Sequence, residues 1–427
     1  MSADKDLMRD ALRPCPSPAF RTLLESQIVD ILLLSSWAFE VKDGRRAEAV
    51  DATLEALERW TQDGLGYATD ASGARLFDAV EVVNHLRWSG VVGGDRYWLD
   101  HSVPTSRRLV SGGNLPAGGP AVNLAPAEFR MQLRRDFDLG VRAVGDKLRL
   151  RAPTPLARPS LRDLKVHSVL EGAEPAEIVA RNEYLEARCL VPESHAITFG
   201  ADLAFVVAPD EVEDPQLSPE QTQLYLRKTE WPIGVTPRVE TLAAELAADR
   251  GTPLEAVSAF WDFINDTLMY GMIHYSDAPA AGLPDWVLDH GWYDCQAGSA
   301  LLISLCRAHG IPARMVSGHF LYPLAPTHHY WTEVWIEDRG WLPFDFFSWD
   351  LSNGGQDPAW RNVFAGQIDH RAVSQCFPTA FTGPMSVRLP AMWQMVVSGT
   401  ETGIEIAYYD ADTASLIYRE RVAVERL

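Results

Sequence analysis

The sequence predicts an α+β protein in which a helix that starts at a cysteine packs on an antiparallel sheet. Three observations predict this class. A helical apolar pattern at Ala297–Ala308 follows Cys295, residues 329–347 read as two strands, and residues 127–207 alternate apolar with polar side chains. We expect four regions: a helical N-terminal region at 1–120, a β-sandwich domain at 127–210, a core at 235–380 and a C-terminal β-hairpin extension at 381–427.

The N-terminal region places apolar residues at helical spacing in three stretches. They are Ala19–Phe39, Ala47–Gln62 and Leu76–Trp88. None of them contains a catalytic set of residue types. We favour a packing extension of the core, with a lid or a module that docks a carrier protein or another partner as the alternatives.

The turn-rich and uncharged stretch 111–126 marks a domain boundary. After it, residues such as Phe129, Met131 and Leu133 alternate with mostly polar neighbours. This period predicts strands with one buried face per sheet, as in a β-sandwich. Residues 385–424 alternate again on both sides of an Asp-Ala-Asp-Thr turn, which predicts a terminal hairpin attached to the core sheet or to the β-sandwich.

Two further helices precede the cysteine helix, at Val239–Ala248 and Pro253–Tyr270. The second has good start signals, because Thr252 can cap it and proline is tolerated in the first turn. We expect both to pack around the cysteine helix. The loop 271–290 then leads into Cys295 and is expected to form one wall of a cleft.

Cys295, His329 and Asp345 follow one another in the order that a cysteine nucleophile needs. The cysteine supplies the sulfur, the histidine moves the proton, and the carboxylate orients the imidazole. The helical pattern starts just after Cys295, which therefore lies in the first turn, and Gly310 and Pro312 end the helix. Unpaired N–H groups and the positive end of the helix dipole favour a thiolate there.

The register of the two following strands decides whether Asp345 can reach His329. If the loop is 337–339, residue 336 pairs with 340 and Asp345 lies opposite Trp331. Asp345 then shares a face with His329, at a diagonal Cβ distance of about 7–8 Å. A slip of one residue would place the two on opposite faces.

Three motifs occur in order around these residues. The first is Arg307–Arg314, Arg-Ala-His-Gly-Ile-Pro-Ala-Arg; the second is His329–Glu333, His-Tyr-Trp-Thr-Glu; the third is Gly340–Asp345, Gly-Trp-Leu-Pro-Phe-Asp. This block resembles the core of the transglutaminase-like superfamily, which comprises papain-related cysteine acyltransferases and peptidases. Many bacterial members also carry a β domain before the core.

The resemblance implies a papain-like transglutaminase core with Cys295 as nucleophile, His329 as base and acid, and Asp345 as orienting carboxylate. His328 competes with His329 for the role of base, and the His-x-Trp motif selects His329. Asp294 and Asp350 are alternatives to Asp345. Asp294 is disfavoured because its charge would raise the pKa of the adjacent thiol.

Acyl transfer also requires an oxyanion hole. The backbone N–H of Cys295 is the first candidate donor, and the Trp292 indole or the Tyr293 hydroxyl is the second. Together with Trp331 these side chains predict an aromatic cleft. A dry cleft would favour an amine over water as the acyl acceptor.

Composition limits the other function classes. The 427 residues carry a formal charge of −20, which disfavours nucleic acid and anionic membranes as partners. The five cysteines are scattered and form no Cys-x-x-Cys pair, so we expect no zinc site and a reducing compartment. No secretory signal and no phosphate loop or dinucleotide fingerprint is recognisable, so we predict a cytoplasmic enzyme without a cofactor.

The sequence therefore predicts a cysteine acyltransferase. Cys295 would attack an amide or thioester carbonyl, form a thioester acyl-enzyme, and pass the acyl group to an amine. A peptidase or amidase that uses water instead is the first alternative. A non-catalytic binding module of the same fold is the second.

Overall fold

The computed structural model describes residues 22–35, 46–111, 120, 122, 125–140, 142–181, 184–208, 216–275, 278, 282–323, 325–377, 393–399, 402–410 and 416–427. The chain divides into two compact units. Unit 1 comprises Met1–Asn123, Asp214–Met315 and Tyr330–Asp369, and unit 2 comprises Leu124–Glu213, Val316–His329 and His370–Leu427.

The N-terminal part of unit 1 combines helices with a small sheet. Its elements are β1 (Thr22–Leu24), α2 (Glu25–Ser35), α3 (Arg46–Gln62), β2 (Ala68–Thr69), β3 (Arg75–Asp78), α4 (Ala79–Gly93), the π-helix η2 (Trp98–Ser102) and α5 (Val103–Val110). The strands form one sheet in the order β1-β3-β2. The prediction of a helix from Leu76 is wrong, because Asp78 ends a strand and caps α4 through its side chain. Both ends of the predicted helix Ala19–Phe39 lie outside the described residues.

Helix α4 packs against the rest of unit 1 through polar contacts to one strand and the loop after it. The Trp88 indole donates to the Tyr270 carbonyl at 3.0 Å. The Asn84 amide donates to the Met272 carbonyl at 3.0 Å and accepts from its N–H at 2.5 Å. These backbone groups are satisfied by a distant helix, which supports the packing role for this region.

Burial of His85 in α4 predicts a pH-dependent stability. Desolvation of its side chain, which is 3% exposed, lowers its pKa to about 4, although the charges of Asp63 and Asp95 oppose the shift. The unfolded chain therefore binds a proton between pH 6.5 and 4 that the folded chain does not. The free energy of unfolding should fall by about 3 kcal/mol over this window. Urea unfolding of wild type and His85→Leu at pH 7, 5.5 and 4 measures it, and equal slopes in both proteins would contradict it.

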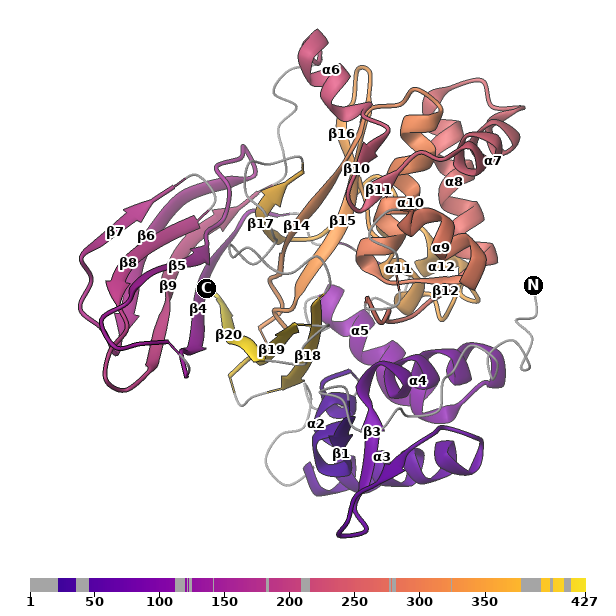
Figure 1. Ribbon diagram of the computed structural model, residues 1–427. Coiled ribbons are helices and arrows are strands. Elements are labelled where there is room, and N and C mark those ends of the chain that lie inside the picture. Colours follow the sequence, from indigo (N-terminus) through magenta and orange to yellow (C-terminus); the bar gives the residue numbers. More distant parts are fainter. Residues whose placement is uncertain are drawn as a thin grey trace. The chain divides into compact units, whose positions relative to one another are not determined.

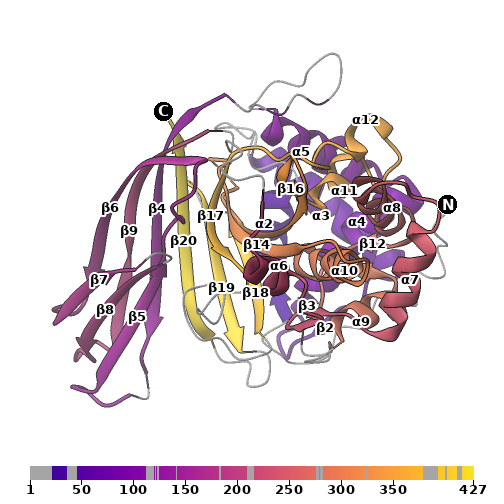
Figure 2. The same cartoon turned by 90° about the horizontal axis from the view of Figure 1, so that it is seen from above.

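The cysteine helix α10 (Cys295–Ala308) lies among three other helices of unit 1, as Figure 2 shows. These are α7 (Pro237–Ala247), α8 (Pro253–Thr267) and α9 (Leu283–His290). The capping prediction for α8 is confirmed, since the Thr252 side chain and Glu255 form a capping box. Every residue of α10 from Gln296 to Arg307 is buried, so this helix is the centre of the core.

Short elements complete unit 1. They are α6 (Pro219–Tyr225), β10 (Thr229–Glu230), β11 (Ile233–Gly234), β12 (Met269–Tyr270), β13 (Trp292–Tyr293), α11 (Phe347–Leu351) and α12 (Pro358–Arg361). Strands β12 and β13 pair in parallel and bring the chain to Cys295. The predicted extension of a strand to Phe347 is wrong. The strand ends at Phe344 because the Asp345 side chain accepts from the Phe347 N–H and turns the backbone into α11.

A four-stranded antiparallel sheet has the order β16-β15-β14-β17. Its strands are β14 (Ala313–Phe320), β15 (His328–Ile336), β16 (Gly340–Phe344) and β17 (Arg371–Cys376). Ile336 pairs with Gly340 and Thr332 with Phe344, so the predicted register is confirmed. The three-residue connection uses Asp338 at φ 65° and Gly340 at φ 74°, left-handed backbone typical of such turns.

Two antiparallel sheets, which Figure 1 shows beside each other, make up most of unit 2; β17 and residues 316–320 of β14 also belong to this unit. The larger has the order β18-β19-β20-β4-β9-β6 and the smaller β5-β8-β7. The strands are β4 (Ala127–Asp138), β5 (Lys147–Pro153), β6 (Leu161–Glu171), β7 (Glu177–Ala180), β8 (Tyr184–Leu190), β9 (Ala196–Val207), β18 (Trp393–Gly399), β19 (Ile404–Asp410) and β20 (Leu416–Arg426). Burial alternates along β4, where Phe129, Met131 and Leu133 face the core.

The C-terminal segment differs from the predicted hairpin in two ways. β19 and β20 do pair as a hairpin, but β18 adds a third strand that the alternation did not predict. β20 also pairs with β4 along its length, so the segment extends the sheet of unit 2. This settles the choice between the two attachment sites that the sequence left open.

A buried ion pair joins β20 to β4. Arg135 lies directly opposite Glu420, and both are 0% exposed. The guanidinium donates to the Glu420 carboxylate at 2.7 Å and to the Arg151 carbonyl at 3.0 Å. Burial opposes ionisation of Glu420, but the Arg135 charge and contacts with His319 outweigh it and lower the pKa to about 2.

Candidate active site

Cys295 is the first residue of α10, directly after the capping residue Asp294. One oxygen of Asp294 accepts from the N–H groups of Gln296 at 3.0 Å and Ala297 at 2.9 Å. The same oxygen accepts from the Tyr275 hydroxyl at 2.9 Å. The cap therefore fixes the backbone that carries the sulfur, and it connects this backbone to the loop before α9.

The electrostatic surroundings of Cys295 correct the prediction of a resting thiolate. Burial of the thiol and the adjacent Asp294 charge raise its pKa well above the usual range, and the Asp345 charge adds to this effect. Backbone N–H groups of Tyr330 and Gln296 act in the opposite direction and do not outweigh it. These surroundings favour the thiol over the thiolate, so a base that takes its proton would assist the attack.

Replacing Asp294 with asparagine should increase the reactivity of Cys295. An asparagine oxygen can still cap α10, while the negative charge beside the thiol is lost. The pKa of Cys295 should fall, so alkylation at pH 7.5 should be roughly threefold to tenfold faster than in wild type. Peptide mapping after timed iodoacetamide labelling measures the rate at Cys295 alone.

The matched control for this change is Asp289→Asn. Asp289 is a carboxylate on α9 whose side chain is 62% exposed in an ion pair with Arg238. Its removal should leave the labelling rate of Cys295 unchanged. A rate in Asp294→Asn that equals or falls below wild type would show that the Asp294 charge does not control the thiol.

His329 is buried in β15, in the part of the strand that belongs to unit 2. Its ring stacks on Phe320 with centroids 4.5 Å apart. The next residue, Tyr330, belongs to unit 1 and donates its backbone N–H to the Cys295 sulfur. Because His329 and Tyr330 are consecutive residues, the His329 backbone lies next to a residue that contacts the nucleophile.

His328 is a poor alternative base. Burial lowers its pKa well below the usual range, and the neighbouring His319 and His329 add to the shift. Its ring meets the His319 ring edge-on at 5.4 Å inside unit 2. A lowered pKa makes His328 a weaker proton acceptor, which favours His329 as the base.

Asp345 lies at the end of β16 and is fully buried. The register of β15 and β16 is confirmed as far as the pair of Thr332 and Phe344, and the Asp345 N–H then donates to the Phe364 carbonyl at 3.1 Å. The position of Asp345 opposite Trp331, on the face of His329, stays a prediction. Its charge acts on Cys295 within unit 1. The assembly of Cys295, His329 and Asp345 into one triad stays a prediction.

The two other aspartates have different roles. Asp294 is occupied as the cap of α10. Asp350 forms a two-point ion pair with Arg87 of α4, at 3.0 and 3.3 Å. The guanidinium also lies over the Tyr270 ring at 5.3 Å.

The sequence did not indicate Arg87 or Tyr275 as residues of this site. Neither lies in a motif, and only the fold brings them here.

The predicted aromatic cleft needs correction. Tyr293 and Trp331 are both 0% exposed, so neither lines an open cleft in this structure. Trp292 is half-buried and packs edge-on against Trp88 and Trp286, at 5.6 and 5.4 Å. Its indole N–H is buried and has no hydrogen-bond partner among the described residues.

Gly298 makes room for Tyr293 beneath the cysteine helix. A Cβ atom there would stand 2.4 Å from Cδ2 of Tyr293 and 3.0 Å from Cδ2 of Phe346. Gly298→Ala should therefore destabilise the chain by about 2 kcal/mol, although alanine is normally the better helix former. Thermal unfolding measures the change. Gly93→Ala in α4 is the control, because its Cβ would meet nothing within 4 Å, and an equal response of both variants would contradict the prediction.

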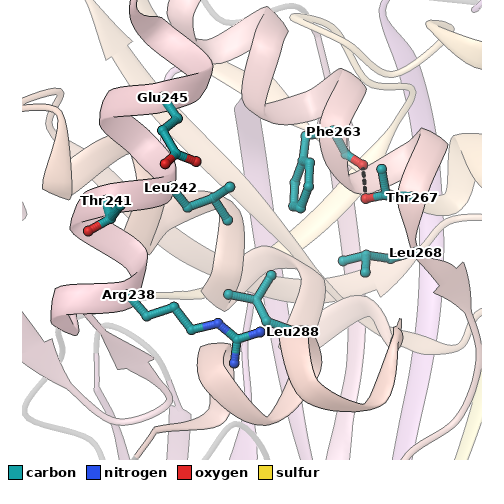
Figure 3. A pocket seen from close by; sticks show the side chains of 8 residues that line it. All are labelled: Arg238, Thr241, Leu242, Glu245, Phe263, Thr267, Leu268 and Leu288. Atoms are coloured by element: carbon teal, nitrogen blue, oxygen red, sulfur yellow. Dashed lines mark hydrogen bonds between the residues drawn. The ribbon is translucent and has the colours of Figure 1, made fainter.

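A surface pocket of about 480 Å³ lies between α7, α8 and α9 (Figure 3). Its lining is mostly apolar, with Arg238 and Glu245 as the charged members. The lining residues are Arg238, Thr241, Leu242, Glu245, Phe263, Thr267, Leu268 and Leu288. None of the candidate catalytic residues lines this pocket.

Two further properties bear on function. In the described part of the chain, one set of side chains could hold a metal ion, namely Asp78, Glu81 and His274, and it includes no candidate catalytic residue. Among the described helices, none is long and apolar enough to cross a lipid bilayer.

Comparison with known proteins identifies the region around these residues. The pattern of the transglutaminase-like superfamily matches residues 240–346, which include Cys295, His329 and Asp345. A protein-glutamine gamma-glutamyltransferase of Pseudomonas aeruginosa is 23% identical over 204 residues, which is 45% of this chain and 30% of that relative. The chain thus spans about a third of the length of that relative.

Solved structures show a weaker likeness. A candidate cysteine protease from Cytophaga hutchinsonii has a TM-score of 0.43 at 17% identity, covering 70% of this chain and 98% of its own. The periplasmic domain of TgpA from Pseudomonas aeruginosa has a TM-score of 0.32 at 18% identity, covering 56% and 93%. The family assignment depends on the match at residues 240–346.

Proposed function

We propose, for a chain whose residues 240–346 belong to the transglutaminase-like superfamily, that Cys295 catalyses acyl transfer from an amide or thioester. The observation that carries the proposal is the position of Cys295. It begins a capped, buried helix, and the N–H of the residue after His329 donates to its sulfur. Cysteine, histidine and aspartate all fall inside the matched residues.

Because the pKa of Cys295 is raised, its attack on the carbonyl needs a base. His329 takes the thiol proton while the sulfur attacks the carbonyl carbon and the C–S bond forms. Asp345 orients the imidazole and stabilises its protonated form. The backbone N–H of Cys295 and the Trp292 indole N–H stabilise the negative oxygen.

Collapse of this intermediate breaks the bond to the leaving group. His329 returns its proton to the departing nitrogen or sulfur, and the acyl group stays on Cys295 as a thioester. An amine then attacks the thioester and loses its proton to His329, which releases an amide and restores the thiol. The name of the Pseudomonas relative supports an amine as the acceptor in this proposal.

Intact-protein mass spectrometry tests the proposal. Wild type is mixed with glutamine-containing peptides or small thioesters, with and without an excess of a primary amine. We expect the mass of an acyl group on Cys295 and, with amine, an amide product. Acid product at every amine concentration would make the chain an amidase or peptidase instead. No adduct and no product with any donor would favour the non-catalytic binding module.

The cytoplasmic location and a carrier-protein partner stay predictions. The contacts of α4 with 270–272 support packing as the role of the N-terminal region. We therefore propose a peptide, amide or thioester as acyl donor without a dedicated docking module. Fractionation of cells with an antibody to the chain would test the location.

A further inference from the structure

Three buried side chains from two distant parts of the sequence converge in unit 1. Asp78 caps α4, Glu81 is in the first turn of that helix, and His274 follows β12. His274 Nε2 lies 3.1 Å from Asp78 Oδ2 and 3.3 Å from Glu81 Oε1. The exposed fractions of the three residues are 1%, 4% and 5%.

Two carboxylates that are both buried need a compensating positive charge. Burying an anion costs several kcal/mol unless the anion is paired. Oδ1 of Asp78 accepts from the Val80 N–H at 2.9 Å. Its other oxygen, Oδ2, accepts no hydrogen bond from the described residues and faces the His274 ring nitrogen. A protonated His274 would supply one positive charge, whereas a divalent metal ion supplies two.

The spacing of the three ligand atoms fits a metal ion. All of them lie within 4.8 Å of one another. Ligands bound at about 2.1 Å are separated by roughly 3.0–3.4 Å in octahedral and tetrahedral sites. The two measured separations, 3.1 and 3.3 Å, fall in this interval. An imidazole with two carboxylates suits a first-row transition metal ion better than Ca²⁺ or Mg²⁺.

We propose that Asp78, Glu81 and His274 bind one divalent transition metal ion, with Zn²⁺ as the preferred ion. Its charge neutralises both carboxylates, and water completes the coordination. The ion ties the start of α4 to the segment 271–275. That segment ends in Tyr275, which donates to the cap of the cysteine helix, so the metal stabilises the approach to Cys295.

The site was not predicted from the sequence, which led us to expect no metal. Asp78 and Glu81 form no recognisable ligand motif, and His274 belongs to a different part of the chain. The proposal does not depend on acyl transfer, because all three ligands lie outside the candidate triad.

Zinc binding to the full chain tests the proposal. Wild type and Cys295→Ala are stripped with a chelator, returned to chelator-free buffer and titrated with Zn²⁺ alone. The Cys295→Ala chain excludes binding at the nucleophile and leaves the three ligands intact. We expect about one retained zinc per chain by mass spectrometry of the metal and a Tm higher by roughly 5 °C at saturating zinc. No retained zinc and an unchanged Tm would overturn the proposal.

Conservative variants locate the bound zinc. Asp78→Asn keeps the helix cap, because asparagine oxygen accepts the same N–H groups, but it removes one charged ligand. Glu81→Gln likewise keeps the side-chain volume. Each should weaken zinc binding at least about tenfold, a loss of 1.4 kcal/mol. Asp289→Asn, which removes an exposed carboxylate, should bind as wild type. Wild-type affinity in both Asp78→Asn and Glu81→Gln would place the ion elsewhere and refute the site.

Discussion

Cys295→Ala is expected to reduce acyl transfer by about 10⁴-fold or more at saturating donor. The thioester intermediate cannot form without the sulfur, so only the oxyanion donors and substrate binding remain. His329→Ala should cause a loss of similar size, because the resting thiol has a raised pKa and needs a base. Release of the leaving group from a chromogenic thioester, followed at pH 7.5, measures each rate.

Cys306→Ala is the control for this series. Cys306 is a second cysteine of the same helix, 0% exposed and surrounded by the core. Its replacement should leave the rate per folded molecule close to wild type. Activity in Cys295→Ala above a hundredth of the wild-type rate, or a large loss in Cys306→Ala, would mean that the nucleophile has been misassigned.

The pH dependence of the His329→Ala variant distinguishes a base from a structural role. Without an internal base, the rate should rise with hydroxide concentration through the pKa of the Cys295 thiol, which burial raises above the usual range. Wild type should instead reach its plateau at lower pH. Parallel profiles for the two proteins would indicate that His329 only packs against Phe320.

Local features of this chain were predictable from the sequence because they depend on neighbouring residues. The start of α8 at Thr252 and the pairing of Ile336 with Gly340 follow from capping and turn chemistry. The motifs between Arg307 and Asp345 indicated the superfamily for the same reason, since they occupy consecutive elements.

Features that depend on the environment were not predictable. The position of Cys295 in the first turn of a helix predicted a lowered pKa and a thiolate. Burial and the Asp294 charge instead raise the pKa of Cys295. Tyr293 was expected in a cleft, but the space beside Gly298 accommodates its ring in the core. The cluster of Asp78 and His274 requires a contact between two distant segments, for which a single sequence carries no signal.

The buried pair of Arg135 and Glu420 shows why a periodic strand can mislead. Along β4, position 135 falls on the buried face, between Leu133 and residue 137, where the alternation calls for an apolar side chain. The charge is tolerated because β20 places Glu420 directly opposite. The pair thus lies at one register position between a strand early in unit 2 and the last strand of the chain, and a slip of this register would separate the two charges.

Glu420→Gln is expected to lower the free energy of unfolding of unit 2 by about 3–5 kcal/mol at pH 7, because it leaves the Arg135 charge buried and uncompensated. The wild-type pair should also weaken in acid. The pKa of Glu420 is about 2 when folded and 4.5 in its ordinary range, so its contribution is complete above pH 4.5 and is lost as the pH falls toward 2. This loss amounts to about 3 kcal/mol and should be absent in Glu420→Gln.

Urea unfolding followed by far-UV circular dichroism at pH 7 and pH 2 measures both effects. The double variant Arg135→Met/Glu420→Leu is the decisive comparison, because apolar residues of similar volume remove both charges together. It should recover most of the stability lost in Glu420→Gln. If the double variant is instead as unstable as the single one, the cost comes from lost packing around Tyr418, whose ring lies 4.8 Å from the Arg135 guanidinium, and not from an unpaired charge. Recovery would mean that the ion pair contributes to the choice of strand register more than to stability.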